Sequence, residues 1–431
     1  MARWSIDGAT LLDPESPGGS RDTQAGRGPS ATRVVIDGDR IETVHSGEEG
    51  PASVPSLGDM PRHDARGLQL APGFIDLHFH GELLFAGPET FASALERASA
   101  DLARHGTTSF LATTVAWEAD RLVGYVTRLV DAMTHTRHKG ARPLGLHLEG
   151  PWISPDAAGA QPSGAIRSYR AHDEDVLTAC GDLLKMVTLA PELEGADALI
   201  DALNRRCVIP ALGHSRVGYD AAAEAFRRGM THVTHLFNAM SGLHHREPGL
   251  AGAVLGGLEG VSCDLICDGV HVAPPIVRVA SRCLGERLCL ISDRIDLPPE
   301  RQGTFGEETG LDFGSGDLVD DGQAWRLSTD GRLAGSRLTL DRAIRNACAY
   351  QAMDPLGAIA SVTLRPARLL GIEDEIGTLR PGSRADLVLL DGAGEVVETW
   401  VGGECVYSAR DPSTGDPSAR VASRPGRVGA A

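Results

Sequence analysis

The chain has 431 residues, of which 42% are hydrophobic and 23% charged, as is typical of a globular protein with a large core. Its 41 Lys and Arg residues against 58 Asp and Glu residues give a formal net charge of −17. This balance argues against general binding to nucleic acid or to an anionic membrane, because both need a basic surface. A local cationic pocket for a small anion remains compatible with it.

The N-terminal sequence MARWSIDGAT lacks the apolar core of a secretory signal, and no run is long and apolar enough to cross a membrane. Several cysteines lie in apolar runs, such as CVIPALG and LCLIS, where a small buried thiol in a reducing compartment is the simplest interpretation. These features favour a cytoplasmic protein.

The two ends of the chain have a similar pattern of short strands and turns. In residues 1–70, WSIDGATLL and TRVVIDGDRIETV each place an Asp-Gly turn inside an apolar alternation. Residues 371–407, which contain ADLVLLDGAGEVVETWVGGECVY, have the same character. The remainder, 408–431, is rich in Pro, Ser, Arg and Gly, and this composition predicts a disordered tail.

Between these ends, residues 71–370 contain eight short apolar runs, most of which end in a polar residue and precede a segment with helical spacing. The runs are APGFIDLHFH, GTTSFLATTV, RPLGLHLEG, LLKMVTLAPE, CVIPALGHS, THVTHLFN, GVSCDLICDG and RLCLISDR. Strands that alternate with helices predict a parallel sheet, and eight such units predict an α/β fold of the (β/α)8 barrel type. In that fold, the reactive groups stand at the carboxyl ends of the strands.

Histidines and carboxylates close five of the eight runs: His78 and His80, Glu149, His214, His235 and Asp293. The first two are separated by one residue, so both imidazoles leave the same face of their strand. Imidazole and carboxylate ligands suit Zn²⁺ and comparable ions. We therefore predict a site for a divalent metal, most simply Zn²⁺, with one or two ions per subunit and with Asp293 available to move a proton.

A nearby histidine, His232, competes with His235 for this role. It lies three residues earlier in THVTHLFN, so it starts the strand and points to the opposite face. We expect His235 to be the ligand and His232 to be a core residue.

Longer stretches are similar to a known family. APGFIDLHFHG, GLHLEGPWISP, THLFNAMSGLHHREPGLAGA, CDGVHVAPP, GRLAGSRLTLDRAIRN and GTLRPGSRADLVLLD resemble the amidohydrolase superfamily and, within it, the N-acetylglucosamine-6-phosphate deacetylases. The resemblance implies a metal-dependent hydrolase of that N-acetyl amide. It also implies a small β-sandwich built from both termini beside the barrel, and a homodimer.

The resemblance assigns roles to individual residues. It implies that Glu149, His214 and His235 bind the principal metal, that His78 and His80 match a pair that supports a second metal in some members, and that Asp293 is the general base and acid. It implies contacts to the phosphorylated amino sugar for Asn238, Ala239 and His271. Arg246 matches an arginine that grips the phosphate, typically from a neighbouring subunit.

Two departures from the family pattern stand out. The family usually has GAH or GTH where this chain has GAQ, so Gln161 replaces a histidine credited with polarising the substrate carbonyl. A glutamine amide donates a hydrogen bond but cannot become a cation, so we expect a catalytic role at a lower rate or on another carbonyl. After Asp293, small apolar residues give way to Arg294 and Asp296, and we expect these to bring charge to the acyl pocket.

Three alternatives stay open. The same chemistry on a different acylated amino sugar or amide is the first, and a non-catalytic protein that binds metal or sugar phosphate is the second. A cyclic amidohydrolase of the dihydroorotase kind shares the barrel and the His-x-His motif. Those enzymes usually bridge two metals with a carboxylated lysine, whereas Glu149 is the expected ligand here.

Overall fold

The structure is a computed structural model, which describes residues 3–15, 32–45, 60–87, 90–136, 139–258, 260–297, 308–312 and 316–411. The predicted disordered tail lies outside these residues, apart from its first four positions. Within the described chain, no helix is long and apolar enough to span a membrane. All eight cysteines lie in the described part and are free thiols.

The middle of the chain forms an eight-stranded parallel sheet in which each strand pairs with the next in chain order. Its strands are β7 (Phe74–Phe79), β8 (Thr107–Thr113), β9 (Arg142–Glu149), β10 (Leu184–Leu189), β11 (Ile209–Leu212), β12 (His232–Val233), β13 (Ser262–Ile266) and β14 (Leu288–Ile291). Each of the eight predicted runs contains one of these strands, so the barrel prediction is confirmed.

The barrel closes at its carboxyl rim, between the segments that follow the first and last strands. The backbone N–H of Asp293 donates to the carbonyl of His78 at 2.9 Å, and the N–H of His80 donates to the carbonyl of Arg294 at 3.1 Å. These bonds hold the end of β7 beside the residues after β14. The closure therefore brings chemistry-bearing residues from the two ends of the sheet to one place.

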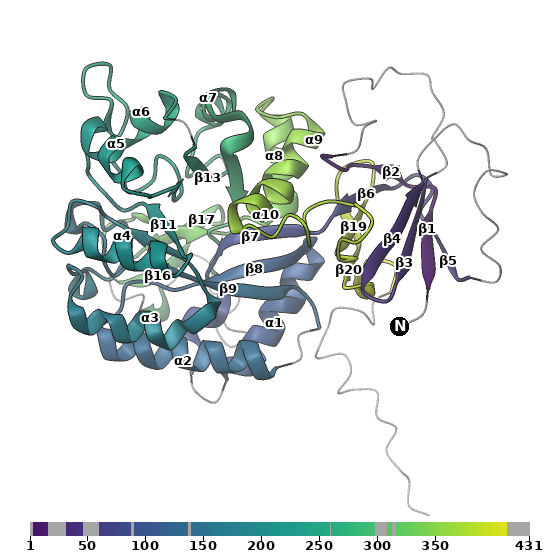
Figure 1. Ribbon diagram of the computed structural model, residues 1–431, viewed down its shortest axis with the longest axis horizontal. Helices are drawn as coiled ribbons and strands as arrows, with labels where there is room; N and C mark the ends of the chain where they lie inside the picture. Colours follow the sequence, from purple (N-terminus) through teal and green to yellow (C-terminus); the bar gives the residue numbers. More distant parts are fainter. Residues whose placement is uncertain are drawn as a thin grey trace, which may run out of the picture.

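Helices surround the barrel, as Figure 1 shows. They are α1 (Phe91–Arg104), α2 (Ala119–His135), α3 (Glu174–Cys180), α4 (Ala196–Arg205), α5 (Tyr219–Arg227), α6 (Gly249–Leu255), α7 (Pro274–Leu284), α8 (Leu340–Ala349), α9 (Pro355–Val362) and α10 (Leu364–Leu370). In α1, the buried residues Phe91, Leu95, Ala98 and Leu102 recur at helical spacing and form one apolar stripe. Short 3-10 segments interrupt the loops, among them η1 (Gly81–Phe85) and η2 (Pro155–Ala157).

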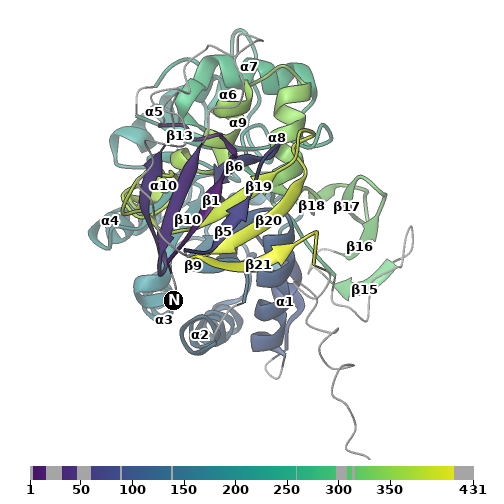
Figure 2. The ribbon, with the colours of Figure 1, turned by 90° about the vertical axis from the view of Figure 1, so that its right-hand side faces the viewer.

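Strands from both ends of the chain form two further sheets, which lie beside the barrel and face the viewer in Figure 2. One has the order β4-β3-β1-β5, and the other has the order β2-β6-β19-β20-β21. Their bounds are β1 (Trp4–Asp7), β2 (Thr10–Leu11), β3 (Arg33–Asp37), β4 (Arg40–His45), β5 (Arg62–Asp64), β6 (Gln69–Pro72), β19 (Leu387–Leu390), β20 (Val396–Val401) and β21 (Glu404–Ser408). The sheets share an apolar core that includes Ile6, Ile36, Leu387 and Trp400. The β-sandwich is thus confirmed, while its limits at residues 70, 371 and 407 stay predictions.

The two Asp-Gly turns of the N-terminal region act differently. Asp37 and Gly38 join β3 to β4 in an antiparallel hairpin, where Gly38 has a φ of +63°. Asp7 and Gly8 instead lead the chain from β1 in one sheet to β2 in the other, because β1 pairs with β3 and β2 pairs with β6. The same dipeptide therefore makes a hairpin in one place and a crossing between sheets in the other.

A four-stranded antiparallel sheet that the sequence patterns did not predict follows β14. It consists of β15 (Glu308–Asp312), β16 (Asp317–Asp320), β17 (Ala324–Leu327) and β18 (Leu333–Ser336), and Figure 2 shows it at the right-hand side of the barrel. The N–H of Ser336 donates to the carbonyl of Asp293 at 2.7 Å, and the indole of Trp325 donates to the carbonyl of Ile295 at 2.8 Å. β18 is therefore fixed beside the segment that carries Asp293.

Candidate active site

Two groups of buried side chains that could hold a metal ion meet at the mouth of the barrel: His78 with His80 and Asp293, and Glu149 with His214 and His235. In each group, the ligand atoms lie within 4.8 Å of one another. His78 is the penultimate residue of its strand, and the other five members either end their strands or follow them by one or two residues. The structure thus brings together all six of the side chains that the sequence placed at the strand ends.

The second group has the spacing of a coordination site. The Nε2 atoms of His214 and His235 lie 3.0 and 2.9 Å from Oε1 of Glu149, and 3.1 Å from each other. A tetrahedral Zn²⁺ with bonds near 2.1 Å separates its ligand atoms by about 3.4 Å. The three atoms therefore converge as ligands of one cation would.

The first group is arranged around the other oxygen of the same carboxylate. The Nε2 atoms of His78 and His80 are 3.2 Å apart and lie 3.6 and 3.4 Å from Oε2 of Glu149. Oδ1 of Asp293 lies 3.5 and 3.2 Å from the same two nitrogens. Because Glu149 turns one oxygen to each histidine pair, it can bridge two adjacent cation positions.

The electrostatics of the two groups favour bound positive charge. Burial alone would raise the pKa of Glu149, but its histidine neighbours, His78 foremost, outweigh burial and hold the pKa well below its usual range. For Asp293, burial is likewise outweighed by His78 and His80, so the pKa is lowered. Burial would lower the pKa of His80, yet Asp293 and Glu149 raise it to about 10. The carboxylates are thus kept ionised with positive charge beside them, which a metal ion can supply.

Backbone strain gathers at the same place. Five of the seven non-glycine residues with positive φ in the described chain are His214, His235, Phe237, Ala239 and Asp293, with φ between +32° and +80°. Such conformations cost about 1–3 kcal/mol each and persist where the surrounding structure enforces them, which is characteristic of functional sites. The clustering marks this rim independently of the ligand chemistry.

Two buried aspartates that the sequence analysis did not single out hold the ligand-bearing backbone. Oδ1 of Asp76 accepts the N–H groups of His78 and Ser292, both at 3.2 Å. Asp264 accepts the N–H of His235 with one oxygen, and its other oxygen lies 3.0 Å from Nε2 of His232. His232 is thus engaged away from the ligand groups, as its position in the strand predicts.

Gln161 is buried and held at both ends of its amide. Its Oε1 accepts the N–H of Ala116 at 2.7 Å, and its Nε2 donates to Oε2 of Glu149 at 2.6 Å. The orientation is consistent because a backbone N–H only donates and a carboxylate only accepts. Gln161 therefore lies against the shared carboxylate, and its predicted action on the substrate carbonyl stays a prediction.

Five of the six ligand residues, all except His78, line a cavity of about 210 Å³ together with Gln161. Its walls also contain three of the predicted substrate contacts, Asn238, Ala239 and His271. Nδ1 of His271 lies 2.6 Å from Oδ2 of Asp268, whose Oδ1 accepts the N–H of His271 itself. This carboxylate fixes the imidazole and was not foreseen from the sequence.

The remaining wall comes from residues 159–161 and 332–335, together with Ile295. Residues 332–335 belong to the GRLAGS motif, which carried the family resemblance but no predicted role. They reach the cavity because β18 is bonded to the Asp293 segment, and this long-range contact has no local signal in the sequence.

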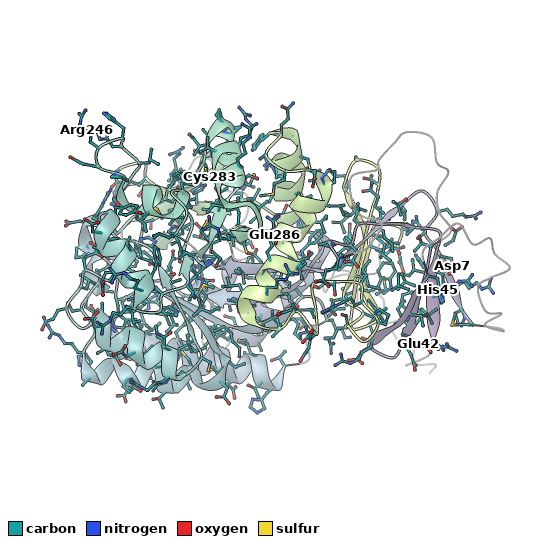
Figure 3. All side chains as sticks on the ribbon, turned by 45° about the horizontal axis from the view of Figure 1, so that its top comes forward. Asp7, Glu42, His45, Arg246, Cys283 and Glu286 are labelled. Atoms are coloured by element: carbon teal, nitrogen blue, oxygen red, sulfur yellow. The ribbon has the colours of Figure 1, made fainter. Side chains whose placement is uncertain are left out.

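Arg246 does not line this cavity. It is exposed in the loop between β12 and α6, with Nη1 2.8 Å from Nε2 of His245. Figure 3 shows Arg246 at the outer end of the barrel, far from the sandwich residues Asp7 and Glu42. Arg246 of this chain is thus outside the chain's own pocket.

The expectation that Arg294 and Asp296 bring charge to the acyl pocket is wrong. The Arg294 guanidinium donates to Asp101 at 2.6 Å and to Asp296 at 2.7 Å, and neither Arg294 nor Asp296 lines the cavity. The segment after β14 pairs with both β7 and β18, and side chains of extended backbone alternate between faces. Asp293 and Ile295 consequently face the cavity, while Arg294 points away.

The chain matches the model of the amidohydrolase family over residues 70–406. It is 35% identical to the human N-acetylglucosamine-6-phosphate deacetylase, over 81% of this chain and 86% of that protein. It is 34% identical to the N-acetylgalactosamine-6-phosphate deacetylase of Escherichia coli O157:H7, over 78% of this chain and 87% of that protein.

Solved structures agree with this relationship. A mutant N-acetyl-D-glucosamine-6-phosphate deacetylase from Mycobacterium smegmatis, in complex with N-acetyl-D-glucosamine-6-phosphate, superposes with a TM-score of 0.80 at 30% identity, over 95% of this chain and 100% of that chain. The corresponding enzyme from Thermotoga maritima gives a TM-score of 0.78 at 28% identity, over 94% of this chain and 100% of that chain. The chain belongs to the amidohydrolase family, in the branch of the N-acetylglucosamine-6-phosphate deacetylases.

Proposed function

We propose that the protein hydrolyses the N-acetyl amide of N-acetylglucosamine 6-phosphate to glucosamine 6-phosphate and acetate. The observation that carries this proposal is the pair of ligand groups that share Glu149, with Asp293 beside them, in a cavity of a chain from the deacetylase branch. A cytoplasmic location is part of the proposal, and the free thiols of the cysteines support it.

The cation in this proposal is Zn²⁺. Glu149, His214 and His235 would hold the principal ion, and His78 and His80, with the other oxygen of Glu149, would hold a second where one binds. A cation bound there would act as a Lewis acid toward the amide carbonyl and the attacking water.

Asp293 is the proposed proton carrier. Its lowered pKa keeps the carboxylate ionised at neutral pH, so it can accept a proton from the attacking water. The same oxygen atoms can then give that proton to the departing amine, which is a poor leaving group without it.

Gln161 is the proposed donor to the substrate carbonyl. Its amide nitrogen donates to Oε2 of Glu149. Gln161 also lines the cavity, which supports a role for its amide beside the substrate carbonyl. A neutral donor in this position would stabilise the developing oxyanion, although without the full charge of an imidazolium.

Asn238, Ala239 and His271 are the proposed sugar contacts, since they line the cavity beside the ligand groups. Arg246 is the proposed phosphate contact to a neighbouring subunit of a homodimer. Its exposed place at the outer end of the barrel, away from its own cavity, supports this arrangement.

A second substrate, N-acetylgalactosamine 6-phosphate, deserves testing because one relative at 34% identity is named for it. The two sugars differ only in the orientation of one ring hydroxyl. The test is acetate release from both sugar phosphates and from the free sugars by Zn²⁺-loaded protein. We expect N-acetylglucosamine 6-phosphate to be hydrolysed fastest. A preference for N-acetylgalactosamine 6-phosphate would change the assigned substrate. If none of the sugars released acetate, the proposed function would be wrong.

A further inference from the structure

Arg332 is the one arginine or lysine among the described residues that line the active-site cavity. It lies in the turn that leads into β18, and its side chain is 52% exposed. In contrast, His80 and Glu149 at the other end of the cavity are each only 3% exposed. The cavity therefore has a buried end rich in carboxylate and imidazole, and an open end with a guanidinium.

The guanidinium is fixed across the cavity mouth. Its Nη1 donates to the carbonyl of Gly159 at 2.6 Å, and its Nε lies 2.6 Å from Oδ2 of Asp330. Gly159 is itself packed tightly, because a Cβ at this position would lie 3.2 Å from the His214 ring and 3.5 Å from the Ala239 methyl group. Arg332 is thus held on the part of the rim that also carries a predicted sugar contact.

Part of the guanidinium is free to bind a ligand. A guanidinium has five N–H donors, and within the described chain its Nη2 makes no hydrogen bond. Its partner Asp330 is exposed, and exposed ion pairs of this kind are held weakly. The planar fork of an arginine matches the oxygens of a phosphate group.

The orientation of the substrate follows from where the reacting amide must lie. Under the proposed function, the acetamido group must reach the ligand groups and Asp293 at the buried end. The phosphate is carried on the opposite side of the hexose ring, so it must lie toward the mouth. There, Arg332 is the cation that this subunit itself supplies.

We propose that Arg332 binds the phosphate of the substrate from within the same subunit and so sets which end of the sugar enters the cavity first. The inference rests on the proposed function. It adds to the phosphate site a residue that needs no neighbouring subunit.

The test compares Arg332→Ala with Arg337→Ala as a matched control. Arg337 follows the same strand, is 43% exposed, pairs with Asp320 and does not line the cavity. For N-acetylglucosamine 6-phosphate, Arg332→Ala should raise KM by about 10- to 100-fold with kcat within about threefold, as expected for a lost hydrogen bond to a charged group. The value of kcat/KM for free N-acetylglucosamine should stay unchanged, and Arg332→Lys should lie between Arg332→Ala and the wild type.

An unchanged KM, or equal losses with the phosphorylated and free sugars, would overturn the role of Arg332. Calorimetric titration with glucosamine 6-phosphate measures binding of the phosphorylated sugar without catalysis. It therefore tests the role of Arg332 even if the proposed function is wrong. If the wild type releases no acetate, the proposed function fails, and weaker binding of glucosamine 6-phosphate to Arg332→Ala than to Arg337→Ala still supports the inference. Equal binding to the two variants would contradict it.

Discussion

The interior of the sandwich and the mouth of the barrel are both buried, but the first contains apolar side chains and the second contains ionisable ones. Between the sandwich sheets lie apolar side chains such as Ile6, Ile36 and Leu387, which gain stability by leaving water. At the barrel mouth, four histidines and two carboxylates are packed together, and several of them have strained backbone. Removing charged groups from water costs free energy even when they are paired, so these side chains lower the stability of the fold. We infer that they are kept for their chemistry.

The contrast predicts that substitutions at the mouth change activity, whereas substitutions in the sandwich change stability.

The largest effect is expected for Glu149→Gln. This carboxylate turns one oxygen to each histidine pair, so the change weakens both cation positions at once. We expect kcat/KM for the proposed substrate to fall by more than about 10³-fold, together with loss of bound metal. Assays of acetate release measure kcat/KM, and mass spectrometry measures the metal content. Full activity with a normal metal content would show that Glu149 is not needed to hold either cation.

Gln161→Ala should have the next largest effect. It removes a donor to Glu149 and the proposed donor to the substrate carbonyl, so we expect kcat to fall on the order of 10²–10³-fold. Gln161→His, which keeps a donor, should lose less. Steady-state kinetics on both variants decides the matter, and an Ala variant as fast as the wild type would show that Gln161 only packs the wall.

Ile36→Ala should leave activity within about twofold but loosen the sandwich. Ile36 is fully buried in β3, and such truncations cost about 2–5 kcal/mol. Hydrogen exchange followed by mass spectrometry should show faster exchange in peptides from β3 and β19, with barrel peptides unchanged. A drop in kcat with slow exchange throughout would break the separation between the two regions.

The smallest effect is expected for Asp7→Asn, and it should depend on pH. Asp7 binds Arg33 through bonds of 2.9 and 2.7 Å; burial would raise its pKa, but Arg33 and Ser5 lower it overall. A lowered folded-state pKa contributes stability that is present above the ordinary pKa of 3.8 and is lost as the pH falls through the lowered pKa. At pH 7, the variant should lose about 1 kcal/mol, and near pH 3 the difference should shrink. Hydrogen-exchange rates of the variant and the wild type at the two pH values measure this difference in stability. A difference that grows in acid would contradict the lowered pKa of Asp7.

Much of the site was predictable because the positions of its residues follow from short sequence patterns within single strands. The His-x-His spacing of His78 and His80 follows from the alternation of side chains on a strand, and the place of Glu149 follows from the rule that barrel chemistry stands at the carboxyl ends of strands. The same rule correctly separated His235 from His232, which the structure places against Asp264.

The parts that were missed depend on contacts between distant segments. The orientation of Arg294 is decided by the pairing of its segment with β7 and β18, and no local pattern reveals that pairing. The bond of Gln161 to Ala116 joins positions 45 residues apart. Residues of β18 reach the cavity only through a sheet whose strands, such as Asp317–Asp320, have four or five residues and are too short to show a clear apolar alternation.

The central claim is that Asp293 moves the proton at a metal site that other residues hold. The most direct test is Asp293→Asn, assayed for acetate release from N-acetylglucosamine 6-phosphate and for bound Zn²⁺ in the same preparation. We predict that Zn²⁺ stays bound at the Glu149, His214 and His235 position while acetate release is abolished. Release at the wild-type rate with Zn²⁺ in place would contradict the claim.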